Sequence, residues 1–214
     1  MYLAYTLIRK LDSKMLKSRD KKILEALELF RCMKRDQIKE LFFKDLKNPI
    51  TATNIVLKRL RRDGYIEAKT SVQPYIYFLN PSTVKKESQK LNHYLSIVDF
   101  YIQLCEFQVP TEFQVEKRYG NRFMQPDIFM EWNKKLFFVE IQRSRYTTEI
   151  MDEKIQRYID YFNYKGWNLY SSNKLDSDSP FIWIVSKSPY QLRTKNIIQT
   201  TNVQEFLKHY NFQI

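Results

Sequence analysis

The sequence predicts an α/β fold, α+β overall, built from two parts of different character. Three helical segments and a β-hairpin account for residues 1–80, whereas the remainder mixes helices with four β-prone runs. Charge is divided in the same way. Residues 1–91 carry 21 Lys and Arg against 10 Asp and Glu, so they hold +11 of the net charge of +12. This asymmetry favours a polyanionic partner for the first part, with a merely solvated basic surface as the alternative.

A boundary is predicted where Asn80-Pro81 is followed by a polar run to Lys90. We therefore expect a domain at 1–80, a linker at 81–91 and a second domain at 92–214. The sequence contains no apolar run of about 18 residues, so we expect no membrane-spanning helix. The N-terminus lacks a charged region before its short apolar run, and the two cysteines and two histidines lie too far apart for a zinc site. We therefore expect a cytoplasmic protein.

Three helices are predicted in the first part from apolar residues at helical spacing. Asp20 can cap the first, the second begins near Lys34, and the third spans 51–63 after the break at Asn48-Pro49. Gly64 is expected to end the third helix as a C′ glycine. The apolar residues expected to face inward are Ile23, Leu24, Leu27 and Phe30 in the first helix, Ile38, Leu41 and Phe42 in the second, and Ala52, Ile55, Val56 and Leu60 in the third.

Two β-prone runs at 65–69 and 75–79 flank a loop at 70–74 and predict a hairpin. The order helix, helix, helix, hairpin resembles a winged helix-turn-helix, and the segments that carry this resemblance are 34–38 and 56–66. The resemblance makes the third helix the recognition helix, which would enter the major groove of double-stranded DNA. The alternative is a winged helix that is used for protein contacts.

The polar stripe of this third helix carries the candidate DNA contacts. Asparagine can read adenine and arginine can read guanine in the major groove, while other cations would pair with phosphates and set the affinity. The candidate DNA-binding residues are Thr53, Asn54, Lys58, Arg61 and Arg62, together with Lys69 in the first strand of the hairpin.

The second part has the predicted order α-β-β-β-α-β. Its helices are expected at 91–107 and 148–162, and its strands at 111–117, 123–130, 136–142 and 181–186. A helix-like stretch at 203–210 lies near the C-terminus, but no role is assigned to residues 191–214.

Two acidic residues are expected to face each other across a hairpin in this part. Asn133-Lys134 can form a two-residue turn, which would place Asp127 directly opposite Glu140, with Gln142 on the same face. Opposed carboxylates repel each other. A divalent cation such as Mg²⁺ would offset that repulsion and could activate a water molecule for attack on a phosphodiester.

Pro126-Asp127 and Glu140-Ile141-Gln142 resemble the motif of the PD-(D/E)XK nucleases. The resemblance implies a mixed-sheet, restriction-endonuclease-like domain that cleaves nucleic acid with Mg²⁺ or Mn²⁺. It also implies that Asp127 and Glu140 are metal ligands. Glu116 corresponds to the additional acid that some members use, and Glu112 is its competitor.

The motif departs from the family at Gln142, where a lysine is usual, because glutamine supplies neither positive charge nor a general base. Lys154 on the following helix is the candidate replacement; the alternative for Lys154 and Tyr158 is an exposed, aromatic-packed helix face. The candidate catalytic residues are thus Asp127, Glu140, Gln142 and Lys154. Two functions stay open: a metal-dependent DNA endonuclease, or a catalytically inactive replication or transcription regulator that uses the fold as a binding scaffold.

The complete series resembles the replication-relaxation family: a winged helix, the segment 92–100, the acidic residues above, and then 154–158. The resemblance implies a role in DNA replication or conjugative transfer of plasmids and mobile elements, with replication or transfer proteins as partners. Winged helices often act as homodimers, but the sequence shows no heptad or hydrophobic tail that identifies a dimer seam.

Overall fold

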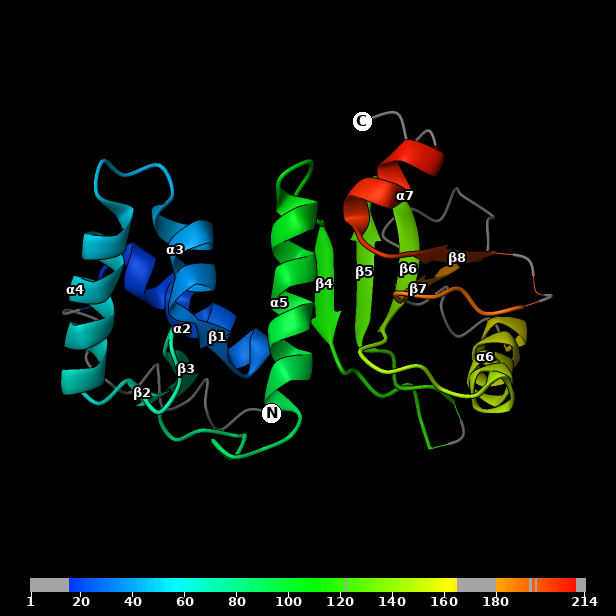
Figure 1. Cartoon of the computed structure of the whole chain (residues 1–214), viewed down its shortest axis with the longest axis horizontal. Coiled ribbons are helices and arrows are strands. Elements are labelled where there is room, and N and C mark those ends of the chain that lie inside the picture. The colour runs from blue at the N-terminus through cyan, green and yellow to red at the C-terminus, as the bar shows by residue number, and fades with distance from the viewer. Residues whose placement is uncertain (1–15, 122, 165–179, 193, 195, 211–214) are drawn as a thin grey trace. The chain divides into compact units, whose positions relative to one another are not determined.

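The computed structural model describes residues 16–121, 123–164, 180–192, 194 and 196–210. Within these residues it contains six helices, a three-stranded antiparallel sheet and a five-stranded mixed sheet, which confirms the mixed α/β class (Figure 1). The chain divides into two compact units, Met1–Leu95 and Ser96–Ile214. Residues 81–91, expected to be a linker, fall within the first of them. None of the helices in the described ranges is long and apolar enough to cross a membrane.

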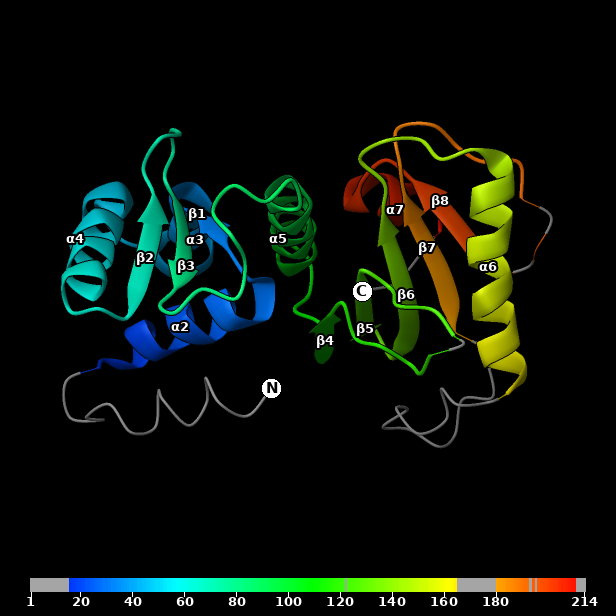
Figure 2. The same ribbon diagram turned by 90° about the horizontal axis from the view of Figure 1, so that it is seen from below.

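The first unit contains the predicted three helices and hairpin, in that order (Figure 2). A short strand that the sequence did not predict, β1, joins the edge of the hairpin, so the sheet has the order β1-β3-β2. Ile66 pairs with Leu79, and Met33 pairs with Tyr77. The elements are α2 (Ser18–Phe30), β1 (Met33–Lys34), α3 (Arg35–Phe43), α4 (Pro49–Arg62), β2 (Ile66–Lys69) and β3 (Ile76–Leu79).

Asp20 fixes the start of α2 and also connects it to α4. The sequence placed Asp20 as the cap of this helix, but α2 begins earlier, with Lys17 as the N-cap and Asp20 in its first turn. From there one carboxylate oxygen of Asp20 accepts the backbone N–H of Lys17 at 2.8 Å, as the third helical residue of a capping box does. The other accepts Nη2 of Arg59, on α4, at 2.6 Å. Asp20 is 1% exposed, so this ion pair is largely removed from solvent at one end. The predicted apolar face of α2 is buried, namely Ile23, Leu24, Leu27 and Phe30.

The inward face of α4 differs from the prediction. Thr53 and Leu57 are buried together with Leu60, whereas Ile55 is 63% exposed. The helix can bury Thr53 because its hydroxyl donates to the carbonyl of Pro49 at 2.7 Å, so no polar group is left without a partner. Gly64 follows the helix with φ of 80°, as expected of a C′ glycine.

The second unit is built on a sheet of order β4-β5-β6-β7-β8, antiparallel from β4 to β6 and parallel from β6 to β8 (Figure 1). The predicted α-β-β-β-α-β order is present, but residues 123–127 precede the strand they were expected to begin, and β8 was not predicted. Residues 91–95 of the helix that leads into this unit, α5 (Leu91–Cys105), fall within the first unit. The elements that follow are β4 (Glu112–Val115), β5 (Ile128–Trp132), β6 (Lys135–Ile141), α6 (Thr148–Asn163), β7 (Phe181–Val185), β8 (Ile197–Thr200) and α7 (Val203–His209).

Alternation along the strands divides the aromatic core between the two faces of this sheet. Phe138 and Ile182 pack in one cluster with residues of α6. Trp183 points the other way and stacks on Phe206 of α7, with ring centroids 4.2 Å apart. Glu140 lies two residues after Phe138, so it shares the face that α6 covers.

The predicted hairpin between β5 and β6 is confirmed with its register. Asn133 and Lys134 have φ of 48° and 61°, as a two-residue turn of this kind requires. Trp132 pairs with Lys135, and Ile128 pairs with Val139. One step beyond that last pair, Asp127 comes opposite Glu140, as the sequence predicted.

Candidate functional site

A basic cavity of about 650 Å³ lies in the first unit, between α4, the start of α3 and the residues around the beginning of β3. Asn54, Lys58, Arg61 and Arg62 contribute one stripe of α4, because positions four, seven and eight residues apart share a helix face. Four cations and no carboxylate occur among its described lining residues, which are Arg35, Asn54, Leu57, Lys58, Arg61, Arg62, Gln73, Tyr75 and Tyr77.

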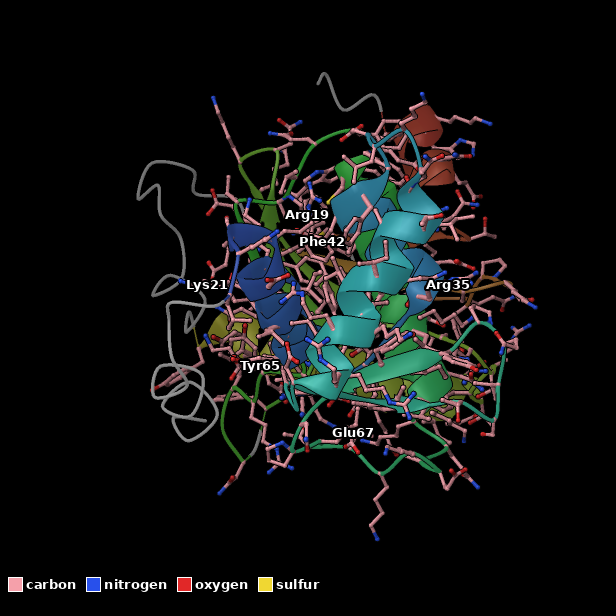
Figure 3. The ribbon with its side chains drawn as sticks, turned by 90° about the vertical axis from the view of Figure 1, so that its left-hand side faces the viewer. Arg19, Lys21, Arg35, Phe42, Tyr65 and Glu67 are labelled. Carbon is pink, nitrogen blue, oxygen red and sulfur yellow. The ribbon has the colours of Figure 1, made fainter. Side chains whose placement is uncertain are left out.

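The cations of this cavity converge rather than merely share a surface. Burial raises the pKa of Tyr77, while the positive charges of Arg61 and Arg35 oppose that rise, so both guanidinium groups act on the same hydroxyl. Figure 3 shows Arg35 beside α4, on the side opposite Lys21. Arg35 pairs with Asp36 and Arg62 with Asp63, each at 2.8 Å. Within the described part of the chain, Lys58 and Arg61 have no ion pair, so a carboxylate does not offset their positive charges.

Four of the six candidate DNA-binding residues therefore lie together: Asn54, Lys58, Arg61 and Arg62. The expectation for Thr53 is wrong, because its side chain is fully buried and bonded to the Pro49 carbonyl, where it cannot reach a ligand. Sequence reasoning missed the other polar lining residues, Arg35, Gln73, Tyr75 and Tyr77. Only Arg35 had a sequence indication, since it lies in the segment 34–38 that carried the winged-helix resemblance.

Lys69 is held elsewhere in the first unit. Its Nζ donates to the carbonyl of Lys86 at 2.9 Å and to Oε2 of Glu87 at 2.6 Å. Lys86 in turn pairs with Glu67 at 2.5 Å. These two ion pairs connect β2 to the segment before α5, so Lys69 has a partner already and is not among the residues that line the cavity.

The second candidate site centres on Glu140, a fully buried carboxylate in β6. Nζ of Lys154 donates to Oε2 at 2.5 Å, and the hydroxyl of Tyr158 donates to Oε1 at 2.5 Å. Lys154 and Tyr158 stand four residues apart on α6 and so share the face that covers the sheet. This finding resolves the alternatives left open for these two residues in favour of contact with the motif.

Local structure fixes α6 over this carboxylate. The side chain of Thr147 accepts the backbone N–H of Ile150 and caps the helix. Met151 and Ile155 are buried and anchor the turn of α6 that carries Lys154. The ammonium of Lys154 also lies 5.9 Å from the ring centroid of Tyr146, within range of a cation–π contact.

Asp127 is beside the Glu140 group but is engaged by the backbone. Its Oδ2 accepts the N–H of Ile141 at 2.7 Å, and its carbonyl accepts the N–H of Glu116 at 3.0 Å. Glu116 itself adopts φ of 49°, and its carbonyl accepts Nε2 of Gln125. Gln142 continues the sheet, since its N–H donates to the carbonyl of Val185 at 2.8 Å.

The electrostatics of the Glu140 group follow from burial. Burial and the charge of Asp127 raise the pKa of Glu140 to about 7, although the hydrogen bonds from Lys154 and Tyr158 oppose the rise. Burial lowers the pKa of Lys154, but the negative charges of Glu140 and Asp127 outweigh it and leave that pKa raised. The pKa of Tyr158 is raised well above its ordinary value by burial and by Glu140. Lys154 is therefore charged and Tyr158 protonated at neutral pH.

The predicted metal site does not fit this arrangement. Both oxygens of Glu140 already have donors, and one of these donors is a cation. Among the residues that the structure describes, which include Glu116, Asp127 and Glu140, no three His, Cys, Asp or Glu side chains form a group that could hold a metal ion. The structure thus brings Asp127, Glu140 and Lys154 together but does not complete the expected acidic triad with Glu116.

The geometry defines a protein with an exposed basic cavity in one unit and a buried acidic motif in the other. Residues 81–173 match the model of the replication-relaxation family, which supports the resemblance predicted from the sequence for this part of the chain. The match includes α5, β4 to β6 and all of α6, and hence Asp127, Glu140 and Lys154. No curated protein matches the chain.

Proposed function

We propose that the protein binds double-stranded DNA through a winged-helix domain in its first unit, with α4 as the recognition helix. The single observation that carries the proposal is the convergence of four cations and Asn54 on one cavity beside the hairpin. The charge balance agrees with it, because residues 1–91 hold +11 of the net charge of +12. An exposed set of cations of this size attracts a polyanion and accelerates its association.

The stripe on α4 suits the major groove of duplex DNA, which is about 12 Å wide and admits one α-helix. Asn54 and Arg61 have the donor and acceptor groups that distinguish adenine and guanine there. Lys58 and Arg62 would neutralise phosphates on either side of the groove. Gln73 and Tyr75, on the hairpin side of the cavity, offer uncharged donors that position the backbone without reading sequence.

The family description supports the setting in which this binding takes place. Residues 81–173 match the model of the replication-relaxation family, whose description links the segment to replication. We propose that the DNA belongs to a plasmid or another mobile element and that the protein acts in its replication or transfer. In this role the first unit locates the DNA, and replication or transfer proteins are the further partners.

The salt dependence of DNA affinity tests the proposal, because each neutralised phosphate adds to the slope of log K against log salt. Fluorescence anisotropy with a labelled duplex would compare the full chain with the double variant Arg61→Ala, Arg62→Ala. If each arginine neutralises one phosphate, the slope should fall by about 1.8. If either reads a base instead, part of the loss becomes a sequence-dependent cost of about 1–3 kcal/mol.

The matched control removes the same charge from another surface of the first unit. Lys21 and Lys22 are exposed on α2, and Figure 3 shows Lys21 on the side of α4 away from Arg35. The double variant Lys21→Ala, Lys22→Ala should keep the wild-type slope and affinity. Equal losses in the two double variants would show a diffuse basic surface and no recognition helix. A wild-type slope in both would remove α4 from the DNA interface.

A further inference from the structure

Glu140 is a buried carboxylate, and the donors to its two oxygens, Lys154 and Tyr158, both belong to α6. We propose that Lys154 is the resident cation of this motif: its ammonium takes the place at Glu140 that a divalent metal would otherwise occupy, so the folded site is closed to metal. The inference concerns the second unit and does not depend on DNA binding by α4.

Burial makes a partner for Glu140 obligatory, because an isolated carboxylate in a protein interior costs several kcal/mol of desolvation. Lys154 supplies the opposite charge at 2.5 Å, and Tyr158 supplies a second donor on the other oxygen. A divalent cation would have to expel the ammonium from Oε2 and the phenol from Oε1 to bind in a bidentate manner. Either exchange breaks a short hydrogen bond that the fold already provides.

Lys154 is held in this position rather than resting there by chance. Its turn of α6 is buried through Met151 and Ile155, and the Tyr146 ring lies 5.9 Å from Nζ. Its side chain is only 24% exposed, so little water competes for the ammonium. The neighbouring acid is also engaged, since Oδ2 of Asp127 accepts the N–H of Ile141.

The sequence of β6 is consistent with this exchange of cations. Gln142, which follows β6 two residues after Glu140, carries no charge, so the position where the motif usually has a lysine does not offset the two acids. Lys154 of α6, fourteen positions after Glu140, supplies the positive charge instead. Lys154 thus offsets the charge of Glu140 without any ion from solution.

Mn²⁺ titration of the full chain tests the inference without relying on an enzymatic activity. Calorimetry and the electron paramagnetic resonance signal of free Mn²⁺ would be followed at pH 8, where Glu140 is ionised. We expect no binding to the wild type that depends on Glu140. Lys154→Met should gain a Mn²⁺ site at least tenfold tighter than any in the wild type, and adding Glu140→Gln should abolish it. Lys134→Met, which removes one exposed charge from the β5–β6 turn, should gain nothing.

Two outcomes would overturn the inference. One is Mn²⁺ binding to the wild type that disappears in Glu140→Gln, since the site would then be open to metal with Lys154 in place. The other is a folded Lys154→Met protein, verified by circular dichroism, that gains no Mn²⁺ site. If Lys154→Met does not fold, the comparison of the wild type with Glu140→Gln still decides the matter. Lys154→Arg, which keeps the charge, should remain closed to Mn²⁺.

Discussion

The α4 cavity and the Glu140 group hold charge in opposite ways. In the cavity, Lys58 and Arg61 are exposed and have no ion pair among the described residues, so their charges are available to a ligand. At Glu140, the carboxylate is buried and each of its oxygens has a donor from α6. Under the proposed function, the first region would set the affinity for DNA, whereas the second contributes to the stability of the fold.

The largest expected effect comes from removing the buried carboxylate. Glu140→Ala leaves the Lys154 ammonium without its counter-charge, so the free energy of unfolding at pH 7 should fall by about 3–5 kcal/mol. Urea unfolding would measure it. Glu153→Ala removes an exposed carboxylate from α6, the helix that carries Lys154, and should change stability by less than about 0.5 kcal/mol. Similar losses in both variants would contradict a special role for the buried pair.

The pH dependence of stability should be the next largest effect. The pKa of Glu140 is raised from 4.5 to about 7, so between these values the folded protein binds more protons than the unfolded chain. The free energy of unfolding therefore falls as pH rises through this window, by about 3 kcal/mol from this group.

Urea midpoints measured from pH 4.5 to 8 would isolate this contribution by comparing the wild type with Glu140→Gln, which does not titrate. The difference between the two proteins should change steadily in favour of the glutamine variant as pH rises. Parallel curves would show that Glu140 titrates near its ordinary value, and the electrostatic contrast between the two regions would then be weaker than the burial of Glu140 suggests.

Tyr158→Phe should have a moderate effect. At pH 8, where Glu140 is ionised, it removes one donor from the carboxylate while keeping the ring in the core, and a hydrogen bond to a charged group contributes about 1.5–3 kcal/mol. Thermal and urea unfolding would measure the loss. Tyr164→Phe, at an exposed position just beyond α6, is the matched control and should unfold like the wild type. An unchanged Tyr158→Phe protein would show that this hydrogen bond adds no net stability.

The smallest effect is expected at Lys69, which the sequence placed among the DNA contacts. Because Glu87 already offsets its charge, Lys69→Ala should cost less than about 1 kcal/mol of stability. The salt slope of DNA binding should stay near that of the wild type, in contrast to Arg61→Ala. A loss of salt slope as large as that of Arg61→Ala would show that the DNA interface includes β2. It would also show that a cation with an ion-pair partner can contribute as much as one without.

Short-range geometry made part of the Glu140 site predictable from the sequence. The Asn133-Lys134 turn and the alternation of strands were enough to place Asp127 opposite Glu140, because a two-residue turn fixes the register of both strands. The contribution of Lys154 could not be settled in the same way. A helix can present several faces to a sheet, and only tertiary packing of Met151 and Ile155 turns Lys154 and Tyr158 toward the carboxylate.

The α4 cavity shows where sequence reasoning fails. The face of α4 was misjudged because Ile55 looks like a core residue and Thr53 does not, yet the Pro49 carbonyl lets the threonine be buried. Arg35 and Tyr75 join α4 only because the fold brings distant segments together. By contrast, the exposed residues Asn54, Lys58 and Arg61 were found, since their helical spacing is a local property of the sequence.

DNA binding through α4 is tested most directly by nuclear magnetic resonance. The backbone amide shifts would be mapped as duplex DNA is added at low salt. We expect the largest shifts at Asn54, Lys58 and Arg61 and in residues 73–77, all weakened by added salt, with β6 and α6 little changed. Shifts that concentrate on β6 and α6 while α4 stays unchanged would contradict the claim.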